Sequence, residues 1–282
     1  MFWEYIKAII FGIIEGVTEW LPISSTGHLI LLDSAISLDI QASEELSSQF
    51  KAMFDVLIQL GAILAVLCIY LKELIPLGKG KNASLSLWGK LILATIPAAI
   101  IGLGADKLCE KHFGLSLDEL LFNPKVVASA LIVYGILFIL VEKLTATNER
   151  SKDITPKRAL AIGFFQALAI VPGTSRSGAT ILGARILGIP REQAARFSFF
   201  AAIPVIAAAG MLKIYDFAKY LYTSGESLGA DAYLLLFAAL LTAFAVSAIT
   251  IGFLTDFVKK HTFIPFGVYR ILLGISVLLF IK

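Results

Sequence analysis

Two short polar stretches interrupt an otherwise apolar chain, and they restrict its fold more than any other feature. The first is residues 15–28, EGVTEWLPISSTGH, and the second is residues 172–180, PGTSRSGAT. A charged side chain at the centre of a membrane helix costs roughly 2.5–3.5 kcal/mol on insertion scales. Both stretches also contain proline and glycine, which interrupt helices. They therefore predict two broken helices around a polar pocket inside a membrane protein.

Composition supports this class of protein. Of the 282 residues, 58% are hydrophobic and 16% are charged, and the mean hydropathy is +0.85, values outside the range of soluble domains. The formal net charge is only +3, and the sequence has no dense basic tract interleaved with aromatic residues. We therefore expect no nucleic-acid partner.

Run lengths predict an all-α integral membrane protein. Six apolar runs, some with their flanks, can cross a bilayer, which needs about 20 residues. These runs lie near residues 54–71, 91–105, 126–141, 197–212, 232–254 and 263–281. The apolar runs beside the polar stretches are shorter, and lengths of about 10–14 residues favour re-entrant segments. We expect six spanning helices and two re-entrant helix-loop-helix hairpins, at about residues 6–38 and 159–190.

The two halves of the chain resemble each other. Residues 12–27 have a counterpart in residues 163–178, with glycine at both ends, and three spanning runs follow each hairpin. Since three is an odd number, the second half must insert upside down relative to the first, as in inverted-repeat transporters. We predict a single membrane domain, residues 1–282, made of the inverted repeats 1–145 and 155–282.

Loop charge predicts the orientation. Lys and Arg are more frequent on the side that holds residues 72–90, 143–158 and 259–260, so that side is expected to face the cytoplasm. Both termini and the first hairpin then face outward, while the second hairpin enters from the cytoplasm. The hairpin tips can meet, and we expect the site to open to the outer (periplasmic or extracellular) face.

The first polar stretch carries two carboxylates on one helical face, because Glu15 and Glu19 are four residues apart. Two like charges need a cation between them, and carboxylate oxygens suit a divalent cation, Mg²⁺ or Ca²⁺. The pair predicts a metal site. The alternative is a solvated helix face, which the apolar neighbours of the pair disfavour.

Hydroxyl residues follow the carboxylates at the expected start of a helix. The free N–H groups and dipole at a helix N-terminus favour a phosphate. His28 follows Ser25 by three residues, close enough to accept its proton or to protonate a leaving group. Helix capping is the alternative role of these hydroxyls. The predicted phosphate contacts here are Ser24, Ser25, Thr26 and Gly27.

The second polar stretch adds a cation. Arg176 offers a planar fork suited to phosphate oxygens, and its alternative role is a structural ion pair with one of the two glutamates. Ser175, Ser177 and Thr180 add hydroxyl donors. Together the two stretches predict phosphoryl transfer on a substrate with its head in water and its tail in lipid.

At these residues the chain resembles the undecaprenyl-diphosphate phosphatase family of the bacitracin-resistance type. The resemblance extends to residues 197–199, FSF, and to residues 263–266, FIPF, with Tyr269 and Arg270, so it covers almost the whole chain. The family commonly has Phe where this chain has Trp20. The resemblance implies an enzyme of the bacterial plasma membrane that hydrolyses a C55 isoprenoid diphosphate to phosphate and the monophosphate carrier of cell-wall synthesis. Because bacitracin sequesters the same lipid, such an enzyme also implies bacitracin resistance.

Residue by residue, the resemblance implies that Glu15 and Glu19 bind the metal or help to activate the attacking group. Ser25 would be the nucleophile, His28 its acid/base partner and Arg176 the diphosphate clamp. The residues implied to support that clamp are Ser175, Ser177 and Thr180. The implied partners are the polyprenyl diphosphate substrate and membrane lipid, and a homodimer is compatible with the sequence.

Alternatives stay open at this stage. The nucleophile is Ser25, His28 or a metal-activated water. A transporter or flippase of a polyprenyl phosphate lipid would also use broken helices and inverted repeats. An intramembrane serine protease would need a serine and a histidine as well, but it has no obvious use for the glutamate pair and Arg176.

Overall fold

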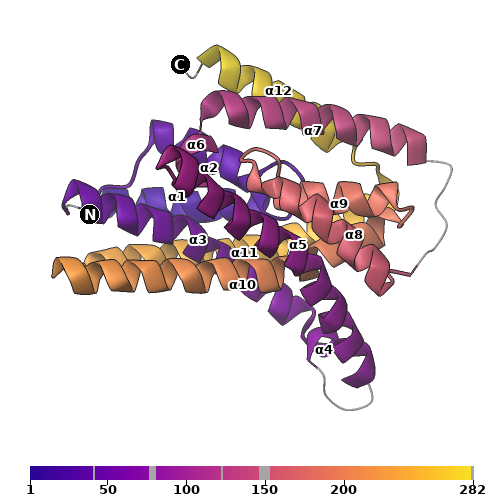
Figure 1. The fold of residues 1–282 in the computed structure, drawn as a ribbon, viewed down its shortest axis with the longest axis horizontal. Coiled ribbons are helices and arrows are strands. Elements are labelled where there is room, and N and C mark those ends of the chain that lie inside the picture. The colour runs from indigo at the N-terminus through magenta and orange to yellow at the C-terminus, as the bar shows by residue number, and fades with distance from the viewer. Residues whose placement is uncertain (41, 76–80, 122, 146–152, 281–282) are drawn as a thin grey trace.

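The structure, a computed structural model, describes residues 1–282 except 41, 76–80, 122, 146–152 and 281–282 (Figure 1). The described part of the chain is helical and contains no strand, which confirms the all-α prediction. The first half holds α1 (Phe2–Thr18), α2 (Ser25–Ala35), α3 (Glu44–Ile69), α4 (Leu71–Leu74), α5 (Lys81–Phe113), α6 (Leu117–Leu121) and α7 (Pro124–Thr145). The second half holds α8 (Pro156–Ala167), the 3-10 turn η2 (Leu168–Ile170), α9 (Arg176–Ile186), α10 (Arg191–Ser224), α11 (Ala230–Lys260) and α12 (Ile264–Phe280).

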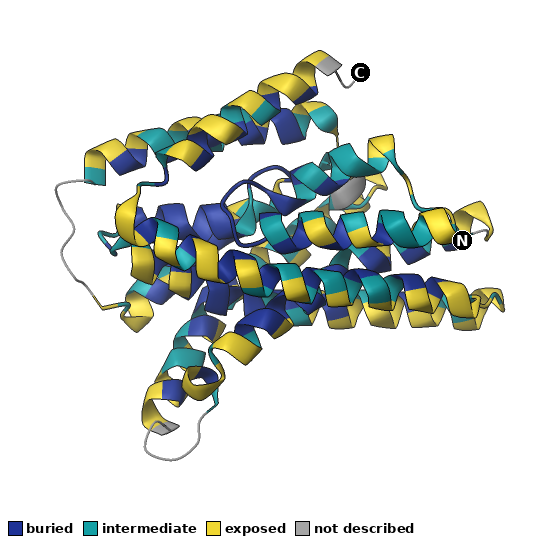
Figure 2. Ribbon diagram, turned by 180° about the vertical axis from the view of Figure 1, so that it is seen from behind, coloured by how far each residue is buried: buried dark blue, intermediate teal, exposed yellow. Residues whose placement is uncertain are grey.

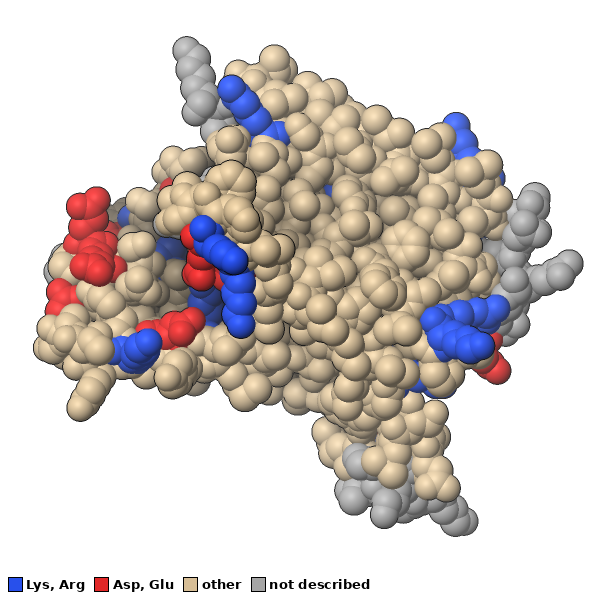
Figure 3. All heavy atoms as spheres, in the orientation of Figure 1, with Lys and Arg blue, Asp and Glu red and all other residues tan. Residues whose placement is uncertain are grey.

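Each of the six predicted apolar runs falls mainly in one helix, namely α3, α5, α7, α10, α11 and α12. The first run extends past the end of α3 to Leu71, and the last predicted position, 281, lies outside the described residues. The first five are long and apolar enough to cross a membrane, and α12 is apolar but only 17 residues long. On the face shown in Figure 3, the charged side chains lie mainly toward the two ends, and the broad surface between them is uncharged. A multi-pass membrane protein accounts for this pattern, because charged groups avoid the hydrocarbon layer.

Helices of one half pack against helices of the other. Helix α1 lies along α11, α8 lies along α5, and α7 lies along α12. Two glycines at matching positions allow the first two contacts: Gly12 of α1 faces the backbone of Ala239, and Gly163 of α8 faces the backbone of Ala94. Small residues let membrane helices approach closely. The two halves therefore make the same kind of contact in reciprocal fashion.

Helices α7 and α12 also approach each other closely through glycines, and the pair forms one edge of the molecule (Figure 1). A Cβ added to either Gly135 or Gly267 would lie 2.7 Å from the carbonyl oxygen of the other glycine. The two backbones are thus in direct contact at this crossing. Figure 1 also shows that the start of α1 and the end of α12 lie toward the same end of the molecule.

Two short helical pairs, α1–α2 and α8–α9, supply the interior of the molecule. Each pair is joined by an irregular turn, residues 19–24 in the first and 171–175 in the second. The first turn and residues 172–174 of the second are buried at the centre, surrounded by the long helices (Figure 2). These pairs match the segments predicted as hairpins, with bounds of 2–35 and 156–186 against the expected 6–38 and 159–190.

We expect Gly12→Ala to destabilise the protein by about 1–3 kcal/mol, because its added methyl would meet the carbonyl oxygen of Ala239 on α11. Gly104→Ala is the matched control: Gly104 lies in α5 with nothing within 4 Å of its added Cβ, and alanine favours a helix by about 1 kcal/mol. Thermal unfolding in detergent measures both. Equal unfolding temperatures for Gly12→Ala and the wild type would contradict the close contact of α1 with α11.

Candidate active site

The same backbone geometry occurs at both hairpin tips. Ser24, just before α2, has a φ of 77°, and Ser175, just before α9, has a φ of 71°. Residues other than glycine are uncommon in this left-handed region. Each serine hydroxyl accepts a hydrogen bond from a backbone N–H three residues later, at Gly27 (3.3 Å) and at Gly178 (3.0 Å). Both predicted phosphate-contacting serines therefore cap helices here.

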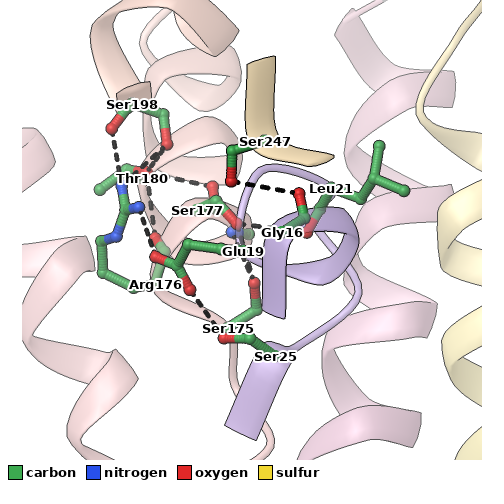
Figure 4. Close-up of polar contacts among 11 residues, drawn as sticks. Gly16, Glu19, Leu21, Ser25, Ser175, Arg176, Ser177, Thr180, Ser198 and Ser247 are labelled. Atoms are coloured by element: carbon green, nitrogen blue, oxygen red, sulfur yellow. Dashed lines mark hydrogen bonds and ion pairs between the residues drawn. The ribbon is translucent and has the colours of Figure 1, made fainter. Parts of the chain in front are cut away.

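Glu19 lies at the centre of the site and connects the two hairpins (Figure 4). Its Oε1 accepts a hydrogen bond from Nη2 of Arg176 at 2.7 Å, and its Oε2 accepts one from the Ser25 hydroxyl at 2.7 Å. The Glu19 and Arg176 side chains are only 7% and 12% exposed. Since buried charges need partners, this ion pair holds the first polar stretch against the second.

The sequence predicts that Ser25 and His28 interact, but the two side chains have different partners. The Ser25 hydroxyl donates to Glu19. The two ring nitrogens of His28 lie 2.7 Å from the Ser24 carbonyl oxygen and 2.7 Å from the Tyr269 hydroxyl. The His28 ring also stacks on Tyr269, with centroids 5.7 Å apart. Ser25, at the start of α2, thus faces Glu19, whereas His28, almost one turn later, faces α12. Glu19 is therefore the group in position to accept the Ser25 proton.

The hydroxyls of the second stretch stabilise its turn and the arginine. Thr180 donates to the hydroxyl of Ser198 at 2.7 Å, and the Ser198 carbonyl accepts from Nη1 of Arg176 at 2.6 Å. The Ser177 hydroxyl lies 3.1 Å from that of Ser175 and 3.3 Å from the carbonyl oxygen of Leu21. Ser198 carried no predicted role. Its signals in the sequence are a lone hydroxyl within an aromatic run and its place in residues 197–199, FSF, which carry part of the family resemblance.

Arg270 is a second arginine at the hairpin tips, and no role is predicted for it from the sequence either. It is fully buried in α12. Its Nη1 donates to the carbonyl oxygen of Pro22 at 3.1 Å, and its Nη2 donates to those of Gly173 and Thr174 at 2.8 and 2.9 Å. One guanidinium therefore fixes both turns through backbone oxygens. Arg270 is therefore a positioning residue for the two turns that carry the site.

A cavity of about 440 Å³ opens beside these groups. Its polar lining comes from the hairpin tips and their neighbours, namely Glu19, Ser25, Thr26, Ser175, Arg176, Gln59, Thr95 and Gln166. Its apolar lining comes mainly from α5 and α10, including Ala98, Ala99, Leu103, Val205, Ile206 and Leu212. The cavity suits a molecule with an anionic head and an apolar chain.

Comparison with known proteins agrees with this geometry. Residues 8–276 match the family described as bacitracin resistance protein BacA. The chain belongs to this family. The match includes both hairpin turns and all but the ends of the chain.

Relatives named undecaprenyl-diphosphatase align with the chain over nearly its whole length. One from Lactococcus lactis subsp. cremoris (strain SK11) is 47% identical, and the alignment covers 98% of this chain and 97% of the relative. One from Enterococcus faecalis (strain ATCC 700802 / V583) is also 47% identical, with 95% and 94% covered. One from Acetivibrio thermocellus is 44% identical, with 98% and 97% covered.

In this BacA family member, the predicted metal ligands Glu15 and Glu19 lie close together in the chain and are both buried. Glu15 is fully buried, and neither of its carboxylate oxygens accepts a hydrogen bond from an N–H or O–H group of the described residues. Glu19 continues the α1 conformation and donates its backbone N–H to the Glu15 carbonyl at 3.0 Å, which keeps both residues on one face. Within the described part of the chain, no group of three or more His, Cys, Asp and Glu side chains could hold a metal. Two carboxylates fit a cation such as Mg²⁺, which takes its other ligands from water and substrate phosphates.

Proposed function

We propose that the chain hydrolyses undecaprenyl diphosphate to undecaprenyl phosphate and inorganic phosphate in the bacterial plasma membrane. The observation that carries this proposal is the Ser25–Glu19–Arg176 network at the polar end of a cavity with apolar walls. The family match and the name of the relatives support it. The apolar walls of the cavity suit the lipid tail, and the arginine suits the diphosphate.

The proposal includes two re-entrant hairpins in an inverted-topology repeat. Its support is the matched geometry of the halves: the left-handed capping serines Ser24 and Ser175, and the matched contacts of Gly12 and Gly163. Loop charge supports an outward-facing site with both termini outside. A broken helix is stable at membrane depth only when protein encloses it, and the first turn and residues 172–174 of the second are buried.

Chemistry begins when the diphosphate displaces the Glu19 carboxylate from Arg176. The guanidinium then holds phosphate oxygens, and Glu19 keeps the hydrogen bond from the Ser25 hydroxyl. Ser25 Oγ forms a bond to the terminal phosphorus while its proton passes to Glu19. The bond from that phosphorus to the bridging oxygen breaks, which releases undecaprenyl phosphate. Water then bonds to the phosphorus and loses a proton to solvent, the bond from phosphorus to Ser25 Oγ breaks, and Glu19 returns the proton to Ser25 Oγ as phosphate leaves.

The residues present fit a divalent cation, Mg²⁺ or Ca²⁺. Glu15, whose buried oxygens have no donor among the described residues, would hold it together with Glu19. When bound, the ion supplies positive charge that offsets the charge of the phosphates. Arg176 supplies the remaining positive charge, and its position is set by the Ser198 carbonyl.

Phosphate release from purified protein in detergent, with a long-chain isoprenoid diphosphate as substrate, tests the function. We expect turnover that stops with EDTA and returns with Mg²⁺ or Ca²⁺. A transporter or flippase would release no phosphate, so the same assay separates the two functions. Absence of turnover in a well-folded sample would overturn the proposal.

Ser25→Ala is expected to lower turnover by about 10³-fold or more, because it removes the nucleophile. A trapped phosphoenzyme should be lost in Ser25→Ala and retained in His28→Ala, since His28 faces Tyr269 rather than Ser25. Normal turnover by Ser25→Ala would exclude the serine and leave a water or His28 as the nucleophile. Ser34→Ala, at an exposed hydroxyl in the same helix, is the control.

A further inference from the structure

Gln166 occupies the position in the second hairpin that Glu15 occupies in the first. Each lies three residues after a glycine that contacts a helix of the other half, Gly12 or Gly163. Each also lies nine residues before a left-handed capping serine (24 − 15 = 9 and 175 − 166 = 9). One hairpin thus carries a carboxylate at this position, and the other carries a neutral amide.

The amide of Gln166 is held with its oxygen free. The side chain is 2% exposed and lines the cavity beside Glu19. Its Nε2 donates to the backbone carbonyl of Ala94 on α5 at 3.1 Å. Its Oε1 is buried and has no hydrogen-bond partner among the described residues. The donor end of the amide is therefore fixed to α5, while the buried acceptor end has no partner among the described residues.

An unpartnered acceptor restricts what can bind there. Phosphate oxygens are acceptors as well, so Gln166 Oε1 would not bind a deprotonated diphosphate directly. A divalent cation with its waters does fit, since amide oxygens are among the ligands of Mg²⁺ and Ca²⁺. The buried, unpartnered oxygens of Glu15 indicate the same kind of species.

We propose that Gln166 contributes its Oε1 to the binding of the divalent cation held by Glu15 and Glu19. This inference rests on the cation of the proposed function and adds the second hairpin to its site. A neutral amide at position 166 also suits the substrate, because a third carboxylate would bind the cation more tightly but would repel the diphosphate. The cation then bridges the two hairpins, as the Glu19–Arg176 ion pair does.

Binding of Mn²⁺ to the purified, substrate-free protein, measured by electron paramagnetic resonance and by calorimetry, tests this role. We expect Gln166→Leu to weaken Mn²⁺ binding by about 10-fold, within the range for lost metal-site contacts. We expect Gln166→Glu to strengthen Mn²⁺ binding and to raise the KM for the lipid diphosphate. Gln193→Leu, at an exposed glutamine of α10, is the matched control and should leave Mn²⁺ binding unchanged.

Wild-type Mn²⁺ affinity in a folded Gln166→Leu protein would overturn the inference. If Gln166→Leu does not fold, Gln166→Glu decides, because damage to the fold cannot strengthen metal binding; unchanged or weaker binding overturns the inference. A wild type that binds no Mn²⁺ also overturns it. A wild type that binds Mn²⁺ through Gln166 but hydrolyses no lipid diphosphate would instead overturn the proposed function alone.

Discussion

Arg176→Ala is expected to lower kcat/KM by about 10³-fold or more, the magnitude that arginines contribute to phosphoryl transfer. Arg176 joins the second hairpin to the first through its charge, with Nη2 on Glu19, and its Nη1 donates to the Ser198 carbonyl of α10. Without it, the diphosphate has no planar cation to hold its oxygens. Phosphate release in detergent measures the loss.

The same substitution should also destabilise the protein, because Glu19 would lose its partner charge while staying buried. Breaking a buried ion pair by removing one partner typically costs about 3–5 kcal/mol. Arg176→Lys separates the two effects: its charge can restore the melting temperature, but a lysine cannot form the two-pronged contact and should not restore turnover. Arg196→Ala, at an exposed arginine paired with Glu73, is the control and should change neither. Wild-type turnover in Arg176→Ala would refute the clamp.

Arg270→Met is expected to destabilise the protein by about 3 kcal/mol or more. The substitution leaves the carbonyl oxygens of Pro22, Gly173 and Thr174 without the Arg270 donors, and each unsatisfied buried group costs roughly 1–3 kcal/mol. Turnover should fall as well, since both turns that carry the site are fixed by this one side chain. Thermal unfolding and phosphate release together measure the effect.

Arg270→Lys provides the graded comparison for that experiment. A lysine retains the charge but cannot place two nitrogens against three carbonyl oxygens in the arginine geometry, so we expect stability and turnover between those of Arg270→Met and the wild type. A Met variant as stable as the wild type would show that the turns hold each other without Arg270.

The sequence predicted the helices well because a bilayer imposes its thickness directly on run length. The six apolar runs fall mainly in long helices, and the shorter runs beside Pro22 and Pro172 form the two short helical pairs. The helices are nevertheless longer than the apolar runs. Helix α5 has 33 residues and α10 has 34, each with an internal proline, because polar residues at the ends of a long helix lie beyond the apolar layer.

The site was predictable in its charges but not in its contacts. Glu19 and Arg176 stand out in the sequence because charges in an apolar chain are rare. The sequence also predicts, as an alternative role of Arg176, an ion pair with one of the two glutamates, and the structure has this pair with Glu19. The contacts of His28 with Tyr269 and of Arg270 with Pro22 join residues 241 and 248 positions apart. Local spacing contains no information on such pairs. It favoured the nearer Ser25 as the partner of His28 for that reason.

The reciprocal packing of the halves has a consequence for how the protein is made. A ribosome produces α1 long before α11, the helix that covers it, and it produces α5 before α8. The first half therefore leaves the ribosome with the glycine face of α1 uncovered and its polar turn still without Arg176 and Arg270. The contacts that Arg176 and Arg270 make with this turn can therefore form only after the second half of the chain has been made. Truncation near the C-terminus would remove a piece of the first hairpin's own support.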